Sequence, residues 1–193
     1  MPKLRYTHYF KSLKIDEKAI LLESQHGTEI SGNVFYLIKE LVNNKDYDSY
    51  KIYVSCRVGT KVKFEEMLEK YGIDRVELLV LSTFKYMKVL ASAKYLFNDN
   101  TFLPFYLKKE GQVYLNTWHG TPLKTLGKGI KNAMHGIGNA QKNFICADYL
   151  LYPNTYTMEH MVEDYMLDNV ALGECVLAGY PRNTAFFNKN RGQ

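Results

Sequence analysis

The sequence predicts an α/β domain in which helices cover a parallel β-sheet. Short apolar runs alternate with segments of helical periodicity along the whole chain, and no internal repeat or linker interrupts them. Strands that alternate with helices form right-handed βαβ units, whose strands are parallel. The length of 193 residues suits one α/β domain. We therefore expect a single Rossmann-like domain.

The predicted strands are short apolar segments, each followed by a turn or a helix. They cover residues 19–24, 50–56, 76–81, 94–98, 112–118, 149–153 and 174–179. The third of these is nearly all apolar, which is typical of a strand buried on both faces of a sheet.

The predicted helices lie between these strands. The first is indicated by apolar residues at i, i+3, i+4 and i+7: Val34, Leu37, Ile38 and Leu41. Further helices are expected over 64–71, 84–93, 139–147 and 156–167. Gly72 is expected to end the helix that precedes it, because glycine tolerates the left-handed conformation of a C-terminal cap.

The first 15 residues form a basic segment of their own. One face of a helix would carry its large apolar and aromatic side chains: Tyr6, Tyr9, Phe10 and Leu13. Basic residues flank that face: Lys3, Arg5, Lys11 and Lys14. Two interpretations are open, a terminal helix that packs on the domain or a helix that lies on an anionic bilayer surface.

Composition and charge narrow the classes of function. Lys and Arg number 25 and Asp and Glu number 20, so the net charge is +5. This charge suits an anionic partner, whether phosphate, nucleic acid or a membrane surface, and does not choose among them. The cysteines at 56, 146 and 175 are widely spaced, so we expect a reducing cytoplasm and neither a disulfide framework nor a metal site. We see no membrane-spanning stretch and no signal peptide, and expect a soluble or peripheral protein.

Two His-Gly pairs follow predicted strands, at the edge where parallel α/β sheets bind ligands. His26 follows the first strand, and is expected either to line the cleft or to cap the next helix. His119 follows the fifth strand and precedes Gly120 and Thr121. His135 and His160 are expected to be solvated and structural, respectively.

Thr121 is predicted to be the N-cap of a helix with Pro122 at its first position. The N–H groups of that first turn, together with Lys124, would form an anion site. His119 stands next to it, and an imidazole, with its ordinary pKa of about 6.5, can act as a general base for a hydroxyl nucleophile. The alternative is a turn histidine that hydrogen-bonds to the backbone.

Residues 116–124 (NTWHGTPLK) resemble the signature of the CDP-glycerol:poly(glycerophosphate) glycerophosphotransferases, the family of teichoic-acid polymerases and primases. Residues 179–183 and 23–27 resemble two further motifs of the family, in the same order along the chain. Thr184 stands where the family usually has an acidic residue. The resemblance covers residues 15–187.

The resemblance implies one lobe of a GT-B fold, in which two Rossmann-like domains face each other across a cleft. It implies transfer of glycerol phosphate, or a related polyol phosphate, from a CDP-linked donor to a hydroxyl of a lipid-linked glycerol-phosphate or saccharide acceptor in teichoic-acid or capsule-type polymer synthesis. His119 would deprotonate that hydroxyl, which attacks the β-phosphorus of the donor while CMP leaves. Substrate or phosphate would be bound by Gly120, Thr121, Lys124, His26 and Arg182, and no cofactor or metal is implied.

The resemblance also implies a division of the chain. Residues 1–15 would be the basic N-terminal segment, residues 16–187 the acceptor-side domain, and residues 188–193 the start of a connection to a C-terminal nucleotide-binding domain. That domain has no counterpart here, so we expect the 193 residues alone not to release CMP from CDP-glycerol. The expected location is the cytoplasm, with peripheral attachment to the inner face of the membrane.

Three other functions are weighed against this one. A nonenzymatic domain that binds acceptor polymer or lipid, and a GT-B glycosyltransferase that uses a nucleotide sugar, both remain open. A nucleic-acid partner is not expected, because the sequence has no ribonucleoprotein motif, GXXG clamp or zinc-ligand spacing, and its charge is scattered.

Overall fold

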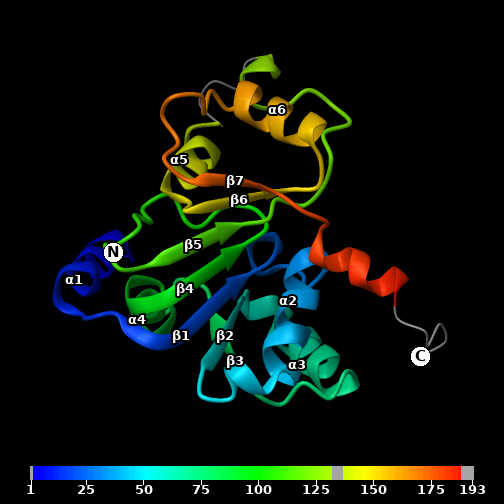
Figure 1. Cartoon of the computed structure of the whole chain (residues 1–193). Coiled ribbons are helices and arrows are strands. Elements are labelled where there is room, and N and C mark those ends of the chain that lie inside the picture. Colours follow the sequence, from blue (N-terminus) through cyan, green and yellow to red (C-terminus); the bar gives the residue numbers. More distant parts are fainter. Residues whose placement is uncertain (1, 132–136, 188–193) are drawn as a thin grey trace.

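The computed structural model describes residues 2–131 and 137–187, and in them a seven-stranded sheet is covered by helices (Figure 1). Its strands are β1 (Asp16–Glu23), β2 (Lys51–Cys56), β3 (Val76–Val80), β4 (Ala93–Asn98), β5 (Val113–Asn116), β6 (Tyr149–Tyr152) and β7 (Glu174–Leu177). All neighbouring strands are parallel, in the spatial order β3-β2-β1-β4-β5-β6-β7. The predicted α/β class and parallel sheet are confirmed.

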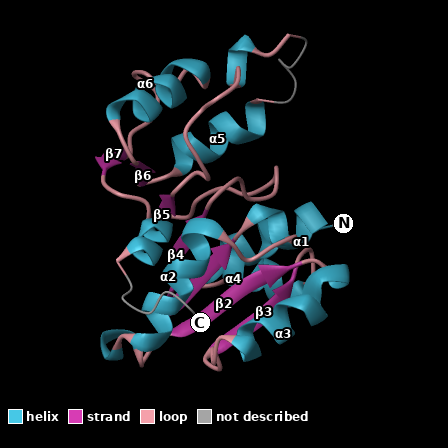
Figure 2. Ribbon diagram, turned by 90° about the vertical axis from the view of Figure 1, so that its right-hand side faces the viewer, coloured by secondary structure: helices cyan, strands magenta, loops and turns pink. Residues whose placement is uncertain are grey.

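Two layers of helices cover the sheet. The helices are α1 (Pro2–Ser12), α2 (Gly32–Asn43), α3 (Lys61–Lys70), α4 (Phe84–Ser92), α5 (Gly138–Cys146) and α6 (Thr155–Asp164). Helices α2 and α3 share one hydrophobic core with β1–β3, and the other helices share a second core on the opposite face, with α5 and α6 over β6 and β7 (Figure 2). Successive residues of β1 serve both cores, Leu21 facing α4 and Leu22 facing α2, as the two-residue period of a strand requires.

The basic N-terminal segment packs on the domain, as one of its two interpretations expects. Helix α1 lies against α4, and the ring of Tyr6 is only 2% exposed. The Tyr6 hydroxyl donates a hydrogen bond to the carbonyl oxygen of Leu107 at 2.7 Å, and the Arg5 guanidinium lies 4.0 Å from the centroid of the Phe84 ring. The outer face of α1 stays exposed and basic.

Two ends of α-helices show why local sequence signals succeed or fail. Gly72, with φ of 62°, ends α3 as expected, because the Ile73 N–H reaches the Leu68 carbonyl oxygen at 2.8 Å in a Schellman motif. Helix α6 ends at Asp164, three residues earlier than predicted. Met166 takes the left-handed conformation there, with φ of 53°, although it is not a glycine.

The expectation that the third strand is buried on both faces is wrong. Strand β3 is at the edge of the sheet, and only Leu79 among its five residues is fully buried. Glu77 points to solvent and pairs with Lys85. An apolar run shows that a strand packs against something, but not how many strands lie beyond it.

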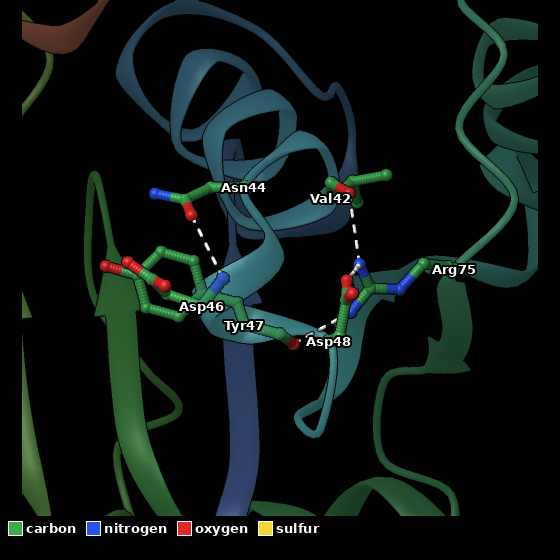
Figure 3. Close-up of polar contacts among 6 residues, drawn as sticks. All are labelled: Val42, Asn44, Asp46, Tyr47, Asp48 and Arg75. Carbon is green, nitrogen blue, oxygen red and sulfur yellow. Dashed lines mark hydrogen bonds and ion pairs between the residues drawn. The ribbon is translucent and has the colours of Figure 1, made fainter.

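Arg75 lies at the end of the sheet where the strands begin, opposite the predicted site, and connects two loops there (Figure 3). Its guanidinium donates to the carbonyl oxygens of Val42 and Tyr47, at 3.0 and 2.7 Å, and to the carboxylate of Asp48 at 2.6 Å. These bonds tie the end of α2 and the following turn to the residue that precedes β3. Arg75 therefore holds together two connections far apart in sequence.

No helix within residues 2–131 and 137–187 has both the length and the apolar character needed to cross a bilayer. The predictions for His135 and for residues 188–193 lie outside the described residues.

Candidate active site

The order of the strands reverses between β1 and β4, and open parallel sheets bind ligands outside the carboxyl ends of the strands at such a point. The residues that follow these two strands are joined by hydrogen bonds. Ser24 Oγ donates to one carboxylate oxygen of Asp99 at 2.7 Å, and the Gln25 N–H donates to the other at 2.9 Å. The buried carboxylate of Asp99 therefore fixes the turn after β1.

That turn carries His26 in an unusual backbone conformation. Gln25, His26 and Gly27 have φ values of 46°, 53° and 71°, in the left-handed region that non-glycine residues seldom adopt. Gly27 is required by space as well, because a Cβ there would lie 3.0 Å from the carbonyl carbon of Cys56. The N-cap of α2 is Ser31, so the alternative that His26 caps this helix is wrong, and the half-buried His26 stays at the edge of the sheet.

His119 follows β5 with its side chain exposed. Its Nδ1 lies 2.8 Å from the main-chain carbonyl oxygen of Asp99. A carbonyl oxygen can only accept a hydrogen bond, so Nδ1 carries the proton and Nε2 has the lone pair. His119 can therefore bond to the backbone through Nδ1 and still act as a general base through Nε2. The two interpretations of this histidine are compatible. The Trp118 ring lies against the imidazole, with 4.0 Å between their centroids.

Side-chain amides hold the main chain next to His119. Asn116 Oδ1 accepts from the Trp118 N–H at 2.9 Å, and Asn116 Nδ2 donates to the Asn100 carbonyl oxygen at 2.9 Å. Asn33 of α2 donates to the Trp118 carbonyl oxygen at 3.2 Å. Trp118 has φ of 50°, and these bonds maintain that left-handed conformation.

Arg182 joins this loop from a distant part of the chain. The segment after β7 crosses to α2 (Figure 1) and forms the 3₁₀ helix η5 (Pro181–Phe186) there. Arg182 Nη1 donates to the His119 carbonyl oxygen at 2.9 Å. Its guanidinium also lies 4.8 Å from the centroid of the Tyr180 ring. Arg182 therefore contacts the main chain of His119 rather than its imidazole.

The prediction of a helix capped by Thr121 is wrong. Residues 121–126 form no regular structure, and the next helical turn is the 3₁₀ helix η4 (Gly127–Gly129). Thr157 Oγ1 donates to Thr121 Oγ1 at 3.4 Å, so this hydroxyl faces α6 instead of capping its own backbone. Two glycines in what would be the second turn also disfavour a helix. The expected anion site of first-turn N–H groups therefore does not exist at this position.

A surface hollow of about 370 Å³ lies at this segment. Its lining consists of residues 118–124 and Leu126. The structure thus brings His119, Gly120, Thr121 and Lys124 together in one hollow. His26 and Arg182 do not line it, but adjoin His119 through Asp99 and through the His119 carbonyl group.

Two buried carboxyl groups lie beneath the site. Burial raises the pKa of Asp99, whereas hydrogen bonds from Gln25 and Ser24 and the nearby imidazoles of His119 and His26 oppose that rise. The Asp99 carboxyl group is therefore influenced by the charges of both imidazoles.

Glu23, the last residue of β1, is the second of these groups. Its Oε2 accepts hydrogen bonds from Tyr86 and Ser55, both at 2.9 Å. Burial raises the pKa of Glu23 to about 7, and the charge of Asp99 adds to the rise.

The sequence did not reveal Asp99 and Asn33 as site residues. Asp99 directly follows the predicted strand 94–98, so the carboxyl-edge rule that selected His26 and His119 also selects it. Asn33 lies within the first turn of α2 and gave no signal, because its partners are 84 and 85 residues away in the chain.

Comparison with known proteins decides the family. The family model described as CDP-glycerol:poly(glycerophosphate) glycerophosphotransferase matches residues 4–193. The chain belongs to this family. The resemblance drawn from residues 116–124 is confirmed.

Relatives of this glycerophosphotransferase-family chain are more than twice as long. It is 31% identical over 186 residues to the teichoic acid poly(glycerol phosphate) polymerase of Bacillus spizizenii, covering 92% of this chain and 44% of that one. It is 28% identical over 194 residues to the teichoic acid glycerol-phosphate transferase of Staphylococcus aureus, covering 95% and 46%. The chain thus spans less than half the length of these relatives.

A solved structure has the same fold. The wall teichoic acid polymerase TagF matches with a TM-score of 0.76 at 24% sequence identity, over 97% of this chain and 45% of that one. TagF is a polymerase of the GT-B type, and this confirms the predicted fold of one lobe.

Proposed function

We propose that this chain is the acceptor-side lobe of an enzyme that transfers glycerol phosphate, or a related polyol phosphate, from a CDP-linked donor to a hydroxyl of a lipid-linked acceptor. Membership of the glycerophosphotransferase family supports the reaction class. The observation that carries the chemistry is the exposed imidazole of His119, whose Nδ1 is bonded to the Asp99 carbonyl group so that Nε2 is free.

In the proposed step, Nε2 of His119 takes the proton of the acceptor hydroxyl. The hydroxyl oxygen forms a bond to the β-phosphorus of CDP-glycerol, the bond from that phosphorus to the bridging oxygen breaks, and CMP leaves with the electron pair. The imidazolium that forms is stabilised by the nearby Asp99 carboxylate. A general base of this kind contributes roughly 10²–10⁴-fold in rate.

The other residues of the hollow would contact phosphate groups. Lys124 supplies a positive charge, and Thr121 supplies a hydroxyl that faces α6. Gly120 lies beside the guanidinium of Arg182, since a Cβ at this position would be 4.0 Å from Nη2. Arg182 itself fixes the His119 carbonyl group, and its remaining N–H groups are available to a phosphate or to a facing lobe.

We assign His26 to the opposite side of Asp99, where a ring N–H would donate to an anion bound at the switch point of the sheet. The left-handed turn that carries it is kept by Gly27 and by hydrogen bonds to Asp99. Such strained conformations concentrate at functional sites.

We also propose that the chain works at the cytoplasmic face of the membrane. The acceptor is lipid-linked, the exposed face of α1 carries Lys3 and Lys11, and Lys14 is exposed just after the helix. Basic residues near an anionic surface contribute about 1 kcal/mol each to binding. Flotation with vesicles that contain phosphatidylglycerol, compared with vesicles of phosphatidylcholine alone, tests this location; equal binding to both contradicts it.

The activity is tested in a chimera. Residues 4–193 replace the matching segment of the Bacillus spizizenii polymerase, and CMP release is measured with CDP-glycerol and a glycerol-phosphate primer. We expect activity that falls roughly 10²–10⁴-fold in His119→Gln and is unchanged in the control His8→Gln, on the exposed face of α1. A chimera that binds primer but releases no CMP would favour a nonenzymatic acceptor-binding domain, and equal activity of both variants would exclude His119 as the base.

A further inference from the structure

A second surface hollow adjoins the one at His119. It has a volume of about 540 Å³. Its lining consists of residues 122–125 together with Tyr156, His160 and Asp164 of α6. The two hollows share residues 122–124, which therefore form the wall between them.

This wall is fixed to α6 at both ends. The Thr121 hydroxyl accepts a hydrogen bond from Thr157, in the first turn of α6. Gly127, with φ of 50°, approaches the end of α6 so closely that a Cβ would lie 2.0 Å from the Asp164 carbonyl oxygen. Between these anchors Leu123 is 95% exposed, and Lys124 is exposed as well. The side chains of Leu123 and Lys124 are thus presented to the outside, whereas Pro122 is buried.

The second hollow gathers hydrogen-bond donors that the fold leaves unused. Within the described chain, the Lys124 ammonium group forms no ion pair. His160 contacts Tyr156 edge to face, with 4.3 Å between the ring centroids. Tyr156 lies in the first turn of α6, at the positive end of the helix dipole. An ammonium group, an imidazole and a phenol hydroxyl are suited to phosphate oxygens.

Asp164 sets a limit on where an anion can bind. It follows His160 by four residues on α6, so both side chains lie on one face of the helix. A phosphate is favoured near Lys124 and His160 and is repelled by Asp164. A carboxylate accepts a hydrogen bond from a hydroxyl, so the Asp164 end of the hollow suits the glycerol carbons between phosphates.

We propose that this second hollow binds an internal phosphodiester of the acceptor chain, next to the glycerol unit whose hydroxyl reacts at His119. The inference rests on the proposed function, because that function directs the acceptor end to His119. An acceptor built of glycerol phosphate carries a phosphodiester one three-carbon unit away from its terminal hydroxyl. Such an acceptor would pass over residues 122–124 from one hollow into the other.

The test compares two soluble probes on the 193-residue chain by calorimetry. One is a synthetic chain of three glycerol phosphates and the other is glycerol 3-phosphate, which has no internal phosphodiester. We expect the trimer to bind about tenfold more tightly. His160→Gln should weaken trimer binding roughly three- to tenfold, as expected for loss of a charge-assisted hydrogen bond, and leave binding of the single unit unaffected. Lys124 lines both hollows, so Lys124→Gln should weaken trimer binding by a similar factor and is not used to compare the two probes.

Lys63→Gln is the matched control, because Lys63 is exposed on α3 at the other face of the sheet and changes the charge equally. The proposal would be overturned if the two probes bound with equal affinity or if the trimer did not bind. It would also be overturned if both hollow variants bound the trimer as tightly as the unmodified chain does. Phosphatidylglycerol vesicles are the third arm. If Lys124→Gln and His160→Gln weaken vesicle binding but not trimer binding, the hollow is a lipid headgroup site and the proposal is wrong.

These outcomes separate the second hollow from the proposed function. If trimer affinity does not depend on Lys124 and His160 while CMP release by the chimera still depends on His119, the assignment of the reaction stands. The proposal that the second hollow binds a phosphodiester is then wrong. If trimer binding depends on Lys124 and His160 while the His119→Gln chimera stays active, the phosphodiester site stands and the base assignment fails.

Discussion

The imidazole Nδ1 of His119 lies 2.8 Å from the main-chain carbonyl oxygen of Asp99, while the carboxylate of the same aspartate accepts hydrogen bonds from Ser24 and Gln25. One buried residue therefore orients the base and fixes the turn that carries His26. It sits where the strand order reverses between β1 and β4. The two His-Gly pairs of the sequence, 93 residues apart, become one site through Asp99.

Asp99→Asn separates the charge of this residue from its geometry. Asparagine keeps the main-chain carbonyl group, accepts from the Gln25 N–H with its oxygen, and can donate its amide to Ser24 Oγ. We expect the fold to persist and CMP release by the chimera to fall about tenfold, because the imidazolium of His119 loses a nearby negative charge. Turnover and thermal melting are measured together; a fall in melting temperature with unchanged turnover would contradict a role for the carboxylate in the reaction.

Glu23 makes stability depend on pH. Burial raises its pKa from 4.5 to about 7, so the folded state holds this proton more tightly than the unfolded chain. The resulting stabilisation is complete below pH 4.5 and is lost as the pH rises through 7. The free energy of unfolding should therefore fall by about 3 kcal/mol over this interval.

Glu23→Gln should flatten this dependence, because its amide oxygen still accepts from Tyr86 and Ser55 but does not titrate. Urea denaturation at pH 4.5 and pH 7.5 measures the effect. The same fall in stability in both proteins would assign the pH dependence to other groups.

Gly27→Ala should destabilise the fold by roughly 1–3 kcal/mol. The new Cβ would lie 2.9 Å from Leu81 Cδ1 and 3.0 Å from the backbone of Cys56, and φ at this position is 71°. Gly59→Ala is the control, because nothing lies within 4 Å of a Cβ there. Urea denaturation compares the two variants, and similar stabilities would show that the turn after β1 relaxes freely.

Arg75→Lys should cost roughly 1–3 kcal/mol of stability, because lysine keeps the charge but loses the paired bonds to the carbonyl oxygens of Val42 and Tyr47. Asp48→Asn should cost less than about 1 kcal/mol, since the Asp48 side chain is 64% exposed. The reverse order of the two effects in urea denaturation would mean that the ion pair, and not the bonds to the main chain, holds this edge. Primer binding at the opposite edge should not change in either variant.

Sequence periodicity was sufficient where one short segment determines the structure. The apolar stripe of Val34, Ile38 and Leu41 is buried on α2 as predicted, and Gly72 ends α3 because the Schellman motif involves only neighbouring residues. The carboxyl-edge rule brought His119 and His26 to the same region of the sheet.

The predictions that were wrong or missing share a physical cause, because each depends on which distant residue or strand becomes the partner. Thr121 had the local features of an N-cap, but its hydroxyl pairs with Thr157, and no helix follows. The position of β3 at the edge of the sheet is set by strand order, which an apolar run does not encode. The carboxyl-edge rule also selects Asp99, but the sequence does not show its partners on the turn after β1, which are 74 and 75 residues away.

The tautomer of His119 can be measured by nitrogen-15 NMR of its ring in the 193-residue chain. In the neutral ring we expect a proton on Nδ1, bonded to the Asp99 carbonyl oxygen, and a lone pair on Nε2. His119→Gln identifies the resonances by their loss. A neutral ring with its proton on Nε2 would contradict the account, because no lone pair would then be available on the exposed nitrogen to accept the proton of an acceptor hydroxyl.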